Sequence, residues 1–208
     1  MKKLLLILLS LPLLTIAQYG KKTEKSQFKT IEINSEMPNI DDKLQSVNGY
    51  SYSLGSISEK NGLIVIFTSN TCPFVIKWED RYTIVEELAK KNNLGLAYIN
   101  SNYKKRDGDD SFKKMKEHAK KYNYRAPYLL DTESTVANSF GAKTTPHVFM
   151  FNKEFQLIYK GAIDDNYNDI NKVKKFYLKD AIEQLSNGEK IKVNETEPVG
   201  CSIKRFKP

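Results

Sequence analysis

The fold is decided by the stretch LIVIFTSNTCPFV, residues 63–75. Its first five residues are apolar and mostly β-branched, which is typical of a strand buried on both faces of a parallel or mixed sheet. The small polar residues 68–71 can turn the chain and cap a helix. Cys72 follows them, and Pro73 suits the first position of a helix. The stretch therefore predicts a buried strand, a short loop and a helix, with a thiol at the junction.

Apolar periodicity extends this pattern in both directions along the chain. The stripe formed by Phe74, Trp78, Tyr82, Val85 and Ala89 predicts that the helix runs to about Lys91. Similar patterns predict a hairpin at Asn48-Gly49, strands at 94–99, 128–130, 147–151 and 156–160, and helices at 112–122, 134–140 and 170–185. We therefore expect an α/β fold in which a central mixed β-sheet is flanked by helices on both faces.

The N-terminus has the pattern of a secretory signal peptide. Lys2 and Lys3 precede an apolar run over 4–16, and small residues favour cleavage after Ala17. The run is too short to span a bilayer, so we expect an exported protein, periplasmic or extracellular, with no membrane contact after cleavage. The expected organisation is a signal peptide at 1–17, a flexible leader at 18–36, a domain at 37–188 and a tail at 189–208 that carries Cys201.

Charge and cysteine content argue against two classes of function, nucleic-acid binding and metal binding. The net charge of +8 comes largely from scattered lysines, which are typical of a solvated surface, so we do not expect a nucleic-acid partner. Cys72 and Cys201 are separated by most of the chain, and with His118 and His147 they do not form a metal-binding pattern. We therefore expect neither a metal nor another cofactor. In an oxidising compartment, however, a pair of cysteines is meaningful.

Cys72 is the candidate nucleophile. Free N–H groups and the helix dipole at the start of a helix favour the thiolate, which attacks disulfides and peroxides. The alternative is an inert core cysteine, but the polar residues before Cys72 and Pro73 after it argue against that interpretation. The segment Thr144-Thr145-Pro146-His147 follows a short helix closed by Gly141 and is a position where a cis proline could stand.

Five short motifs occur in order along the chain: Cys72-Pro73, Glu79-Asp80-Arg81, 145–148, 161–165 and 200–204. With them, residues 36–205 resemble the thioredoxin-like superfamily. The similarity is to its redoxin branch, which is related to alkyl hydroperoxide reductase and thiol-specific antioxidant proteins, and to exported bacterial thioredoxin family proteins within it. The resemblance implies a thioredoxin-like fold with an N-terminal extension and a C-terminal tail. It also implies a thiol–disulfide oxidoreductase or a thiol-dependent antioxidant protein.

The resemblance also implies a site. Pro146 would be the cis proline that faces Cys72, and Thr145 would offer main-chain groups to a bound substrate, beside Thr71 and Pro73. The implied partners are protein thiols and disulfides, or a peroxide, together with an external thiol reductant.

The chain departs from the best-known redoxin patterns at several positions. Thioredoxins have a second cysteine three residues after the first, where this chain has Val75. Typical peroxiredoxins have a proline where this chain has Val65, although Ser69 fits their hydroxyl position. Arg81 and Arg125 are candidates for an arginine that steadies a thiolate, and His147 could tune Cys72 if its ring points inward.

The role of Cys201 has three interpretations from the sequence. It could be a resolving thiol that attacks an oxidised Cys72, half of a permanent disulfide that fixes the tail, or a free thiol. The functions that the sequence leaves open for the whole protein are a thiol–disulfide oxidoreductase or thiol-dependent antioxidant protein, a peroxiredoxin-type peroxidase, and a non-enzymatic secreted module with a structural Cys72–Cys201 bridge.

Overall fold

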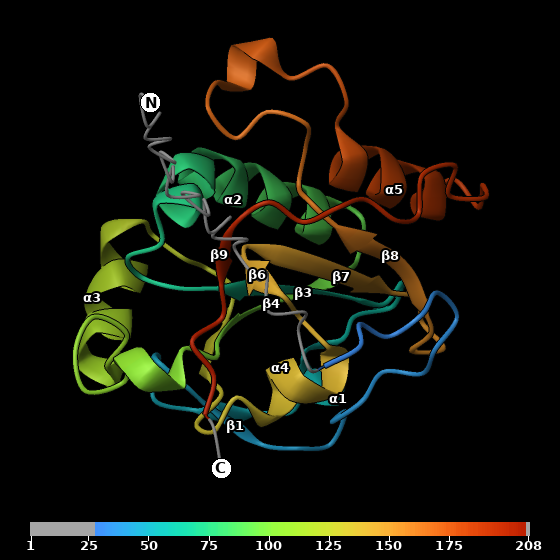
Figure 1. Cartoon of the computed structure of the whole chain (residues 1–208). Helices are drawn as coiled ribbons and strands as arrows, with labels where there is room; N and C mark the ends of the chain where they lie inside the picture. The colour runs from blue at the N-terminus through green and yellow to red at the C-terminus, as the bar shows by residue number, and fades with distance from the viewer. Residues whose placement is uncertain (1–27, 207–208) are drawn as a thin grey trace, which may run out of the picture.

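The structure is a computed structural model that describes residues 28–206 (Figure 1), so the expected signal peptide and the first part of the expected leader lie outside it. The elements are β1 (Leu44–Ser46), β2 (Ser51–Tyr52), α1 (Leu54–Ile57), β3 (Leu63–Thr68), α2 (Pro73–Lys91), β4 (Gly95–Asn100), α3 (Phe112–Lys121), β5 (Tyr128–Leu130), α4 (Thr135–Phe140), β6 (Thr144–Thr145), β7 (His147–Phe151), β8 (Leu157–Gly161), α5 (Tyr177–Ser186) and β9 (Cys201–Ser202). Short 3₁₀ turns occur at Tyr103–Lys105 and Ile170–Lys172.

The central sheet is mixed, as the sequence predicts. Its seven strands in the described chain follow the order β2-β1-β5-β4-β3-β7-β8. Strand β3 pairs in parallel with β4 and antiparallel with β7, and all six of its residues are buried. Its apolar sequence is therefore explained by its central position. Because β3 is an interior strand, the loop that follows its C-terminal end places Cys72 near the middle of that end of the sheet.

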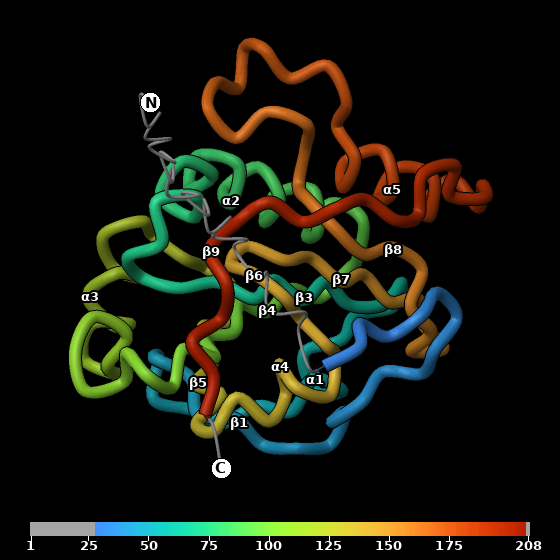
Figure 2. Tube along the Cα trace, in the orientation of Figure 1, coloured from blue at the N-terminus to red at the C-terminus, as the bar shows by residue number. Residues whose placement is uncertain are grey.

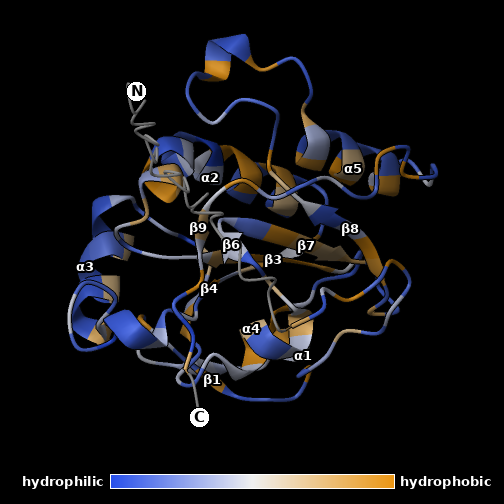
Figure 3. Ribbon diagram, viewed as in Figure 1, coloured by the Kyte–Doolittle hydropathy of each residue, from blue (hydrophilic) through white to orange (hydrophobic). Residues whose placement is uncertain are grey.

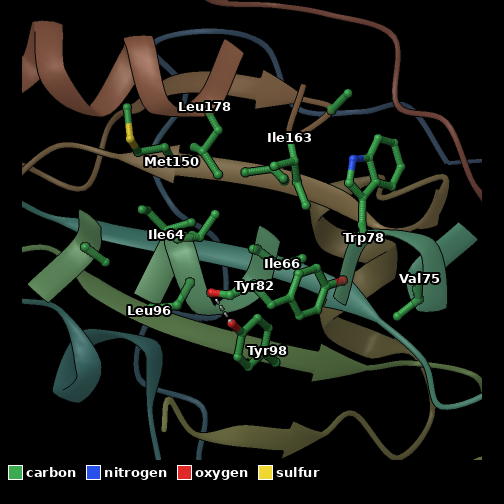
Figure 4. Packing of buried hydrophobic residues seen from close by; sticks show 14 of the residues in the cluster. Ile64, Ile66, Val75, Trp78, Tyr82, Leu96, Tyr98, Met150, Ile163 and Leu178 are labelled. Atoms are coloured by element: carbon green, nitrogen blue, oxygen red, sulfur yellow. Dashed lines mark hydrogen bonds between the residues drawn. The ribbon is translucent and has the colours of Figure 1, made fainter. Parts of the chain in front are cut away.

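Helices cover both faces of the sheet. One apolar cluster joins the sheet to α2, α3 and α5, and the other joins it to α1 and α4. Figure 4 shows the first cluster, in which Trp78 and Tyr82 of α2 lie against strand residues such as Ile66 and Tyr98. The strands between the helices are the most hydrophobic segments, and hydrophilic residues colour the outer loops (Figure 3). The expected α/β architecture is confirmed.

Residues 28–36 of the expected flexible leader are bound to the domain, which corrects that part of the prediction. The Ile31 amide donates to the Phe140 carbonyl at 3.1 Å, and the Asn34 amide donates to the Leu157 carbonyl at 2.8 Å. Ile31 and Ile33 pack against the cluster that contains α4. The polar composition of this segment gave no indication of the packing of Ile31 and Ile33 or of these main-chain hydrogen bonds.

The last helix begins later than predicted. Ile170 and Val173 fit the apolar spacing, but the regular helix starts only at Tyr177. The segment before it is held by Asp165, whose side chain accepts the Lys174 amide at 2.9 Å and whose amide donates to the Lys175 carbonyl at 3.2 Å. These bonds occupy main-chain groups that a longer helix would need.

The C-terminal tail crosses the body of the protein. In Figure 2 it leaves α5, passes in front of β8 and β7, and descends past β6 toward β5. Near its end it forms β9, which pairs antiparallel with β6 in a separate two-stranded sheet. The tail therefore reaches the same end of the sheet as Cys72, which follows the C-terminal end of β3.

Candidate active site

Cys72 is the N-cap residue of α2 and Pro73 is the first residue of that helix. The loop before it is fixed by Asn70, whose amide donates to the Asp110 carboxylate at 2.8 Å and whose side-chain oxygen accepts the Tyr128 hydroxyl at 2.9 Å. Cys72 is 5% exposed, whereas Thr71 and Pro73 on either side of it are exposed. The Cys72 side chain is therefore buried in a loop that hydrogen bonds hold in place.

The Cys72 thiol faces the segment that contains Pro146. The Thr145–Pro146 peptide bond is cis. The Cys72 Sγ donates to the Thr145 carbonyl oxygen at 3.0 Å, and the Ser69 and Thr145 hydroxyls are 3.4 Å apart. The structure thus brings Cys72, Thr145 and Pro146 together, although they are far apart in sequence.

Cys201 reaches the same place from the tail. In the β6–β9 ladder it lies opposite Thr145, and both cysteines are free thiols. Burial, followed by the hydrogen bond and the electrostatic interaction with Cys72, raises the pKa of the Cys201 thiol to about 11. The amide of Phe74, in the first turn of α2, opposes this shift by hydrogen bonding to Cys201. The two sulfurs therefore form one interacting pair at the start of α2.

His147 lies on the other face of the sheet from Cys72. Its ring packs against Phe149, with the ring centroids 4.4 Å apart, and Phe149 belongs to the cluster that contains α4. Its Nδ1 accepts the Lys143 amide at 3.1 Å. Burial, followed by the positive charges of Lys143, Lys160 and Arg205, lowers the pKa of His147 to about 3. His147 is therefore a neutral core residue, and these contacts give it no imidazolium to offer Cys72.

The neutral state of His147 makes stability depend on pH. Its folded pKa lies below the ordinary value of 6.5, so the stabilisation is complete above that value and is lost as the pH falls toward 3. For this group alone, we expect the free energy of unfolding to fall by about 3 kcal/mol between pH 7.5 and about pH 4.5. Denaturant unfolding of wild type and His147→Asn at both pH values would measure it. Equal losses in the two proteins would contradict this assignment.

The two candidate arginines are held elsewhere. Arg81 is buried and its Nε donates to the Asp164 carboxylate at 3.2 Å, and the same carboxylate accepts the Trp78 indole N–H at 3.2 Å. Arg125 lies beside the C-terminal half of α2, where its Nε donates to Glu86 at 2.8 Å. The structure therefore places neither guanidinium against the Cys72 sulfur.

The residues that position the tail are hard to recognise from the sequence pattern. The Lys204 amide donates to the side-chain oxygen of Asn102 at 2.8 Å. Gly200 packs so closely against the Thr145 carbonyl that a Cβ at this position would overlap it. The only available signal was the glycine immediately before Cys201. Asp110, which anchors the Cys72 loop, lies in a polar segment with no distinguishing pattern.

Residues 28–206 contain no group of three or more histidine, cysteine or acidic side chains able to hold a metal ion. No helix in the same range combines the length and apolarity needed to cross a membrane.

Comparison with known proteins gives a family and several structural relatives. The family model of Redoxin matches residues 32–176, and no curated protein matches the chain. An uncharacterized conserved protein from Geobacillus kaustophilus is 25% identical with a TM-score of 0.79, and the match covers 86% of this chain and 95% of that one. A hypothetical protein from Sinorhizobium meliloti 1021 is 27% identical with a TM-score of 0.78, and the match covers 88% of this chain and 100% of that one.

A more distant match carries a functional name. A peroxidoxin from Mycobacterium tuberculosis is 15% identical with a TM-score of 0.56, and the match covers 77% of this chain and 97% of that one. At this identity the similarity shows the fold alone, which is thioredoxin-like.

Proposed function

Because the chain belongs to the Redoxin family, we propose that it is an exported thiol–disulfide oxidoreductase in which Cys72 attacks and Cys201 resolves. The observation that carries the proposal is the β6–β9 register, which sets Cys201 opposite Thr145 while the Cys72 thiol donates to the carbonyl of the same residue. Export is supported by the two lysines and the apolar run at 1–17.

In the proposed first step, the Cys72 thiolate attacks one sulfur of a disulfide. The substrate S–S bond breaks, a Cys72–substrate mixed disulfide forms, and the other half leaves as a thiolate that takes a proton from water. Cys201 remains protonated near neutral pH, because burial, followed by its interactions with Cys72, raises its pKa to about 11. Cys72 is therefore the thiol that reacts first.

The second step follows from the same electrostatics. Once Cys72 is in the mixed disulfide its sulfur has no ionisable thiol, so the two interactions with Cys72 that raise the Cys201 pKa are removed. Cys201 then loses its proton to water and attacks the Cys72 sulfur. The bond between Cys72 and the substrate breaks, a Cys72–Cys201 disulfide forms, and the second half of the substrate leaves as a thiolate that takes a proton from water. An external thiol reductant supplies the two electrons that restore both thiols. The raised pKa of Cys201 thus favours Cys72 as the first thiol to attack.

Replacing Cys201 with serine is expected to stop the reaction after the first step. The mixed disulfide on Cys72 then accumulates, because no neighbouring thiol can displace it. Mass spectrometry after treatment with 2-hydroxyethyl disulfide would detect the added mercaptoethanol mass on the Cys72 peptide. Ser202→Ala, the next residue of β9, is the matched control and should retain full cycling. No accumulation in Cys201→Ser would exclude the resolving role.

Two other functions remain as outcomes of tests on the wild-type protein. A peroxidase would form a sulfenic acid at Cys72 with hydrogen peroxide much faster than free cysteine does. A structural module would contain a Cys72–Cys201 bridge that resists mild reduction, as peptide mapping before and after treatment would reveal. A bridge that opens and closes reversibly supports the oxidoreductase.

A further inference from the structure

The geometry points to a substrate class for this site: low-molecular-weight disulfides, with disulfides of extended polypeptides excluded. This inference rests on the proposed function and concerns what can reach Cys72. The main-chain edge beside Cys72 is already paired with the protein's own tail. A substrate that binds by adding a strand therefore has no free edge to use.

The occupied edge is β6, the segment immediately before Pro146. Thr144 pairs with Ser202 and Thr145 pairs with Cys201, in antiparallel register. The remaining carbonyl contact is also used, because the Thr145 oxygen accepts the Cys72 thiol at 3.0 Å. A polypeptide that recognises a sheet edge does so through these main-chain groups. Here the tail provides the strand, with a cysteine at the position opposite Thr145.

The tail lies too close for another chain to enter beside it. A Cβ built on Gly200 would overlap the Thr145 carbonyl and approach the Pro146 nitrogen. Only glycine, which lacks a Cβ, allows the tail backbone to lie this near. The contact between β9 and β6 is therefore a close main-chain packing that leaves no room for a third strand on the same side.

The tail is fixed on both sides of β9. Upstream, the Thr196 hydroxyl accepts the Ala162 amide at 2.9 Å. Downstream, the Lys204 amide donates to Asn102 at 2.8 Å, the Ile203 amide donates to the Lys143 carbonyl at 3.2 Å, and the Ile203 side chain is 8% exposed in the core. Displacing β9 would break these contacts, so an incoming polypeptide competes with a strand that is already anchored.

The remaining approach to Cys72 suits a small molecule. Cys72 is 5% exposed, and Thr71 and Pro73, on either side of it in the chain, are exposed. A disulfide with short substituents needs only to bring one sulfur in line with Sγ, whereas a peptide must also place its backbone. The chemistry is the exchange already described, in which the small disulfide is reduced to two thiols and the enzyme pair is oxidised.

The test compares two substrates on the Cys201→Ser protein, in which the mixed disulfide is trapped on Cys72. The substrates are 2-hydroxyethyl disulfide and a disulfide-linked dimer of a short extended peptide. We expect the small disulfide to form the adduct at least about tenfold faster than the peptide. Adding Gly200→Ala, which forces the tail away from Thr145, should reduce this preference by about tenfold through faster reaction of the peptide.

The matched control is Gly108→Ala in the same background. An added Cβ at Gly108 meets no atom closer than 4.0 Å, so the preference for the small disulfide should be unchanged. If the Gly200→Ala protein does not fold, Ile203→Asp provides a second way to release the tail, because it places a charge at a buried anchor.

The outcomes separate this inference from the proposed function. Equal rates with both substrates in the Cys201→Ser protein would overturn the substrate class and leave the oxidoreductase intact. Absence of an adduct with either substrate would instead overturn the proposed function. An unchanged preference after release of the tail, verified by hydrogen exchange at Ser202, would show that the tail is not what excludes the peptide.

Discussion

Replacing Cys72 with serine is expected to lower thiol-dependent turnover by about a thousandfold or more, because a hydroxyl at this position forms no thiolate. The measurement is the steady-state reduction of 2-hydroxyethyl disulfide with an excess of external thiol reductant. Folding should be nearly unaffected, since a serine hydroxyl can also donate to the Thr145 carbonyl that now accepts the Cys72 thiol at 3.0 Å. Loss of activity would therefore report chemistry rather than unfolding.

The matched control for this variant is Cys201→Ser. It should retain the rapid first step and lose only the second, so a single turnover distinguishes the two cysteines. If Cys72→Ser kept the wild-type rate, the nucleophile would have to be another group and the proposed mechanism would fail. If both single variants lost the first step, Cys201 would have to take part in the initial attack.

Replacing Arg81 with methionine is expected to lower the free energy of unfolding by about 3–5 kcal/mol. The side chains of Arg81 and Asp164 are 5% and 4% exposed, so the variant leaves a buried carboxylate without its counter-charge. Denaturant unfolding would measure the loss. Adding Asp164→Asn should recover part of it, because the remaining group is then neutral and can still accept from Trp78.

Arg125→Met is the control for this prediction. Arg125 is half exposed, and its partner Glu86 keeps a hydrogen bond from the Arg125 amide at 2.9 Å after the side chain is removed. The loss of stability should therefore be much smaller than for Arg81→Met. The rate of Cys72 alkylation against pH should be unchanged in both variants, and a clear shift in the Arg81 variant would restore the thiolate-tuning role for that residue.

The elements that the sequence predicts well are those with long apolar patterns. Strand β3 is a continuous run of large apolar residues, and α2 combines Pro73 at its first position with a stripe of buried side chains. In both cases the burial pattern, the local conformational propensity and the residues at the ends of the element predict the same structure. The position of Cys72 at the start of α2 followed from that agreement.

The pairing of β6 with β9, which brings Cys201 to the site, could not be predicted from sequence patterns. Strands β6 and β9 contain two residues each, Thr144–Thr145 and Cys201–Ser202, which is too short for an alternation to be visible. Their register depends on contacts between segments far apart in the chain. The sequence placed a cysteine in the tail, but only the fold brings it opposite Thr145.

The sequence left the direction of the His147 side chain open and placed the start of α5 too early. Both features depend on contacts that form only in the whole fold. The direction of His147 is set by its pairing with Phe67 in β3, which turns it toward the α4 side of the sheet. The start of α5 is set by main-chain bonds to Asp165. Neither partner is close enough in sequence to be recognised from spacing.

One buried lysine links the two ends of the described chain. The Lys160 ammonium donates to the Ile31 carbonyl at 3.0 Å and lies 3.5 Å from Glu32 and 3.2 Å from Glu195, while its main chain pairs with the tail at Asn194 and Thr196. Segments that share an anchor tend to open as one cooperative unit. The leader is thereby coupled to the tail that carries Cys201. Amide exchange at Ile31, remote in sequence from both cysteines, becomes a reporter of whether the tail is docked.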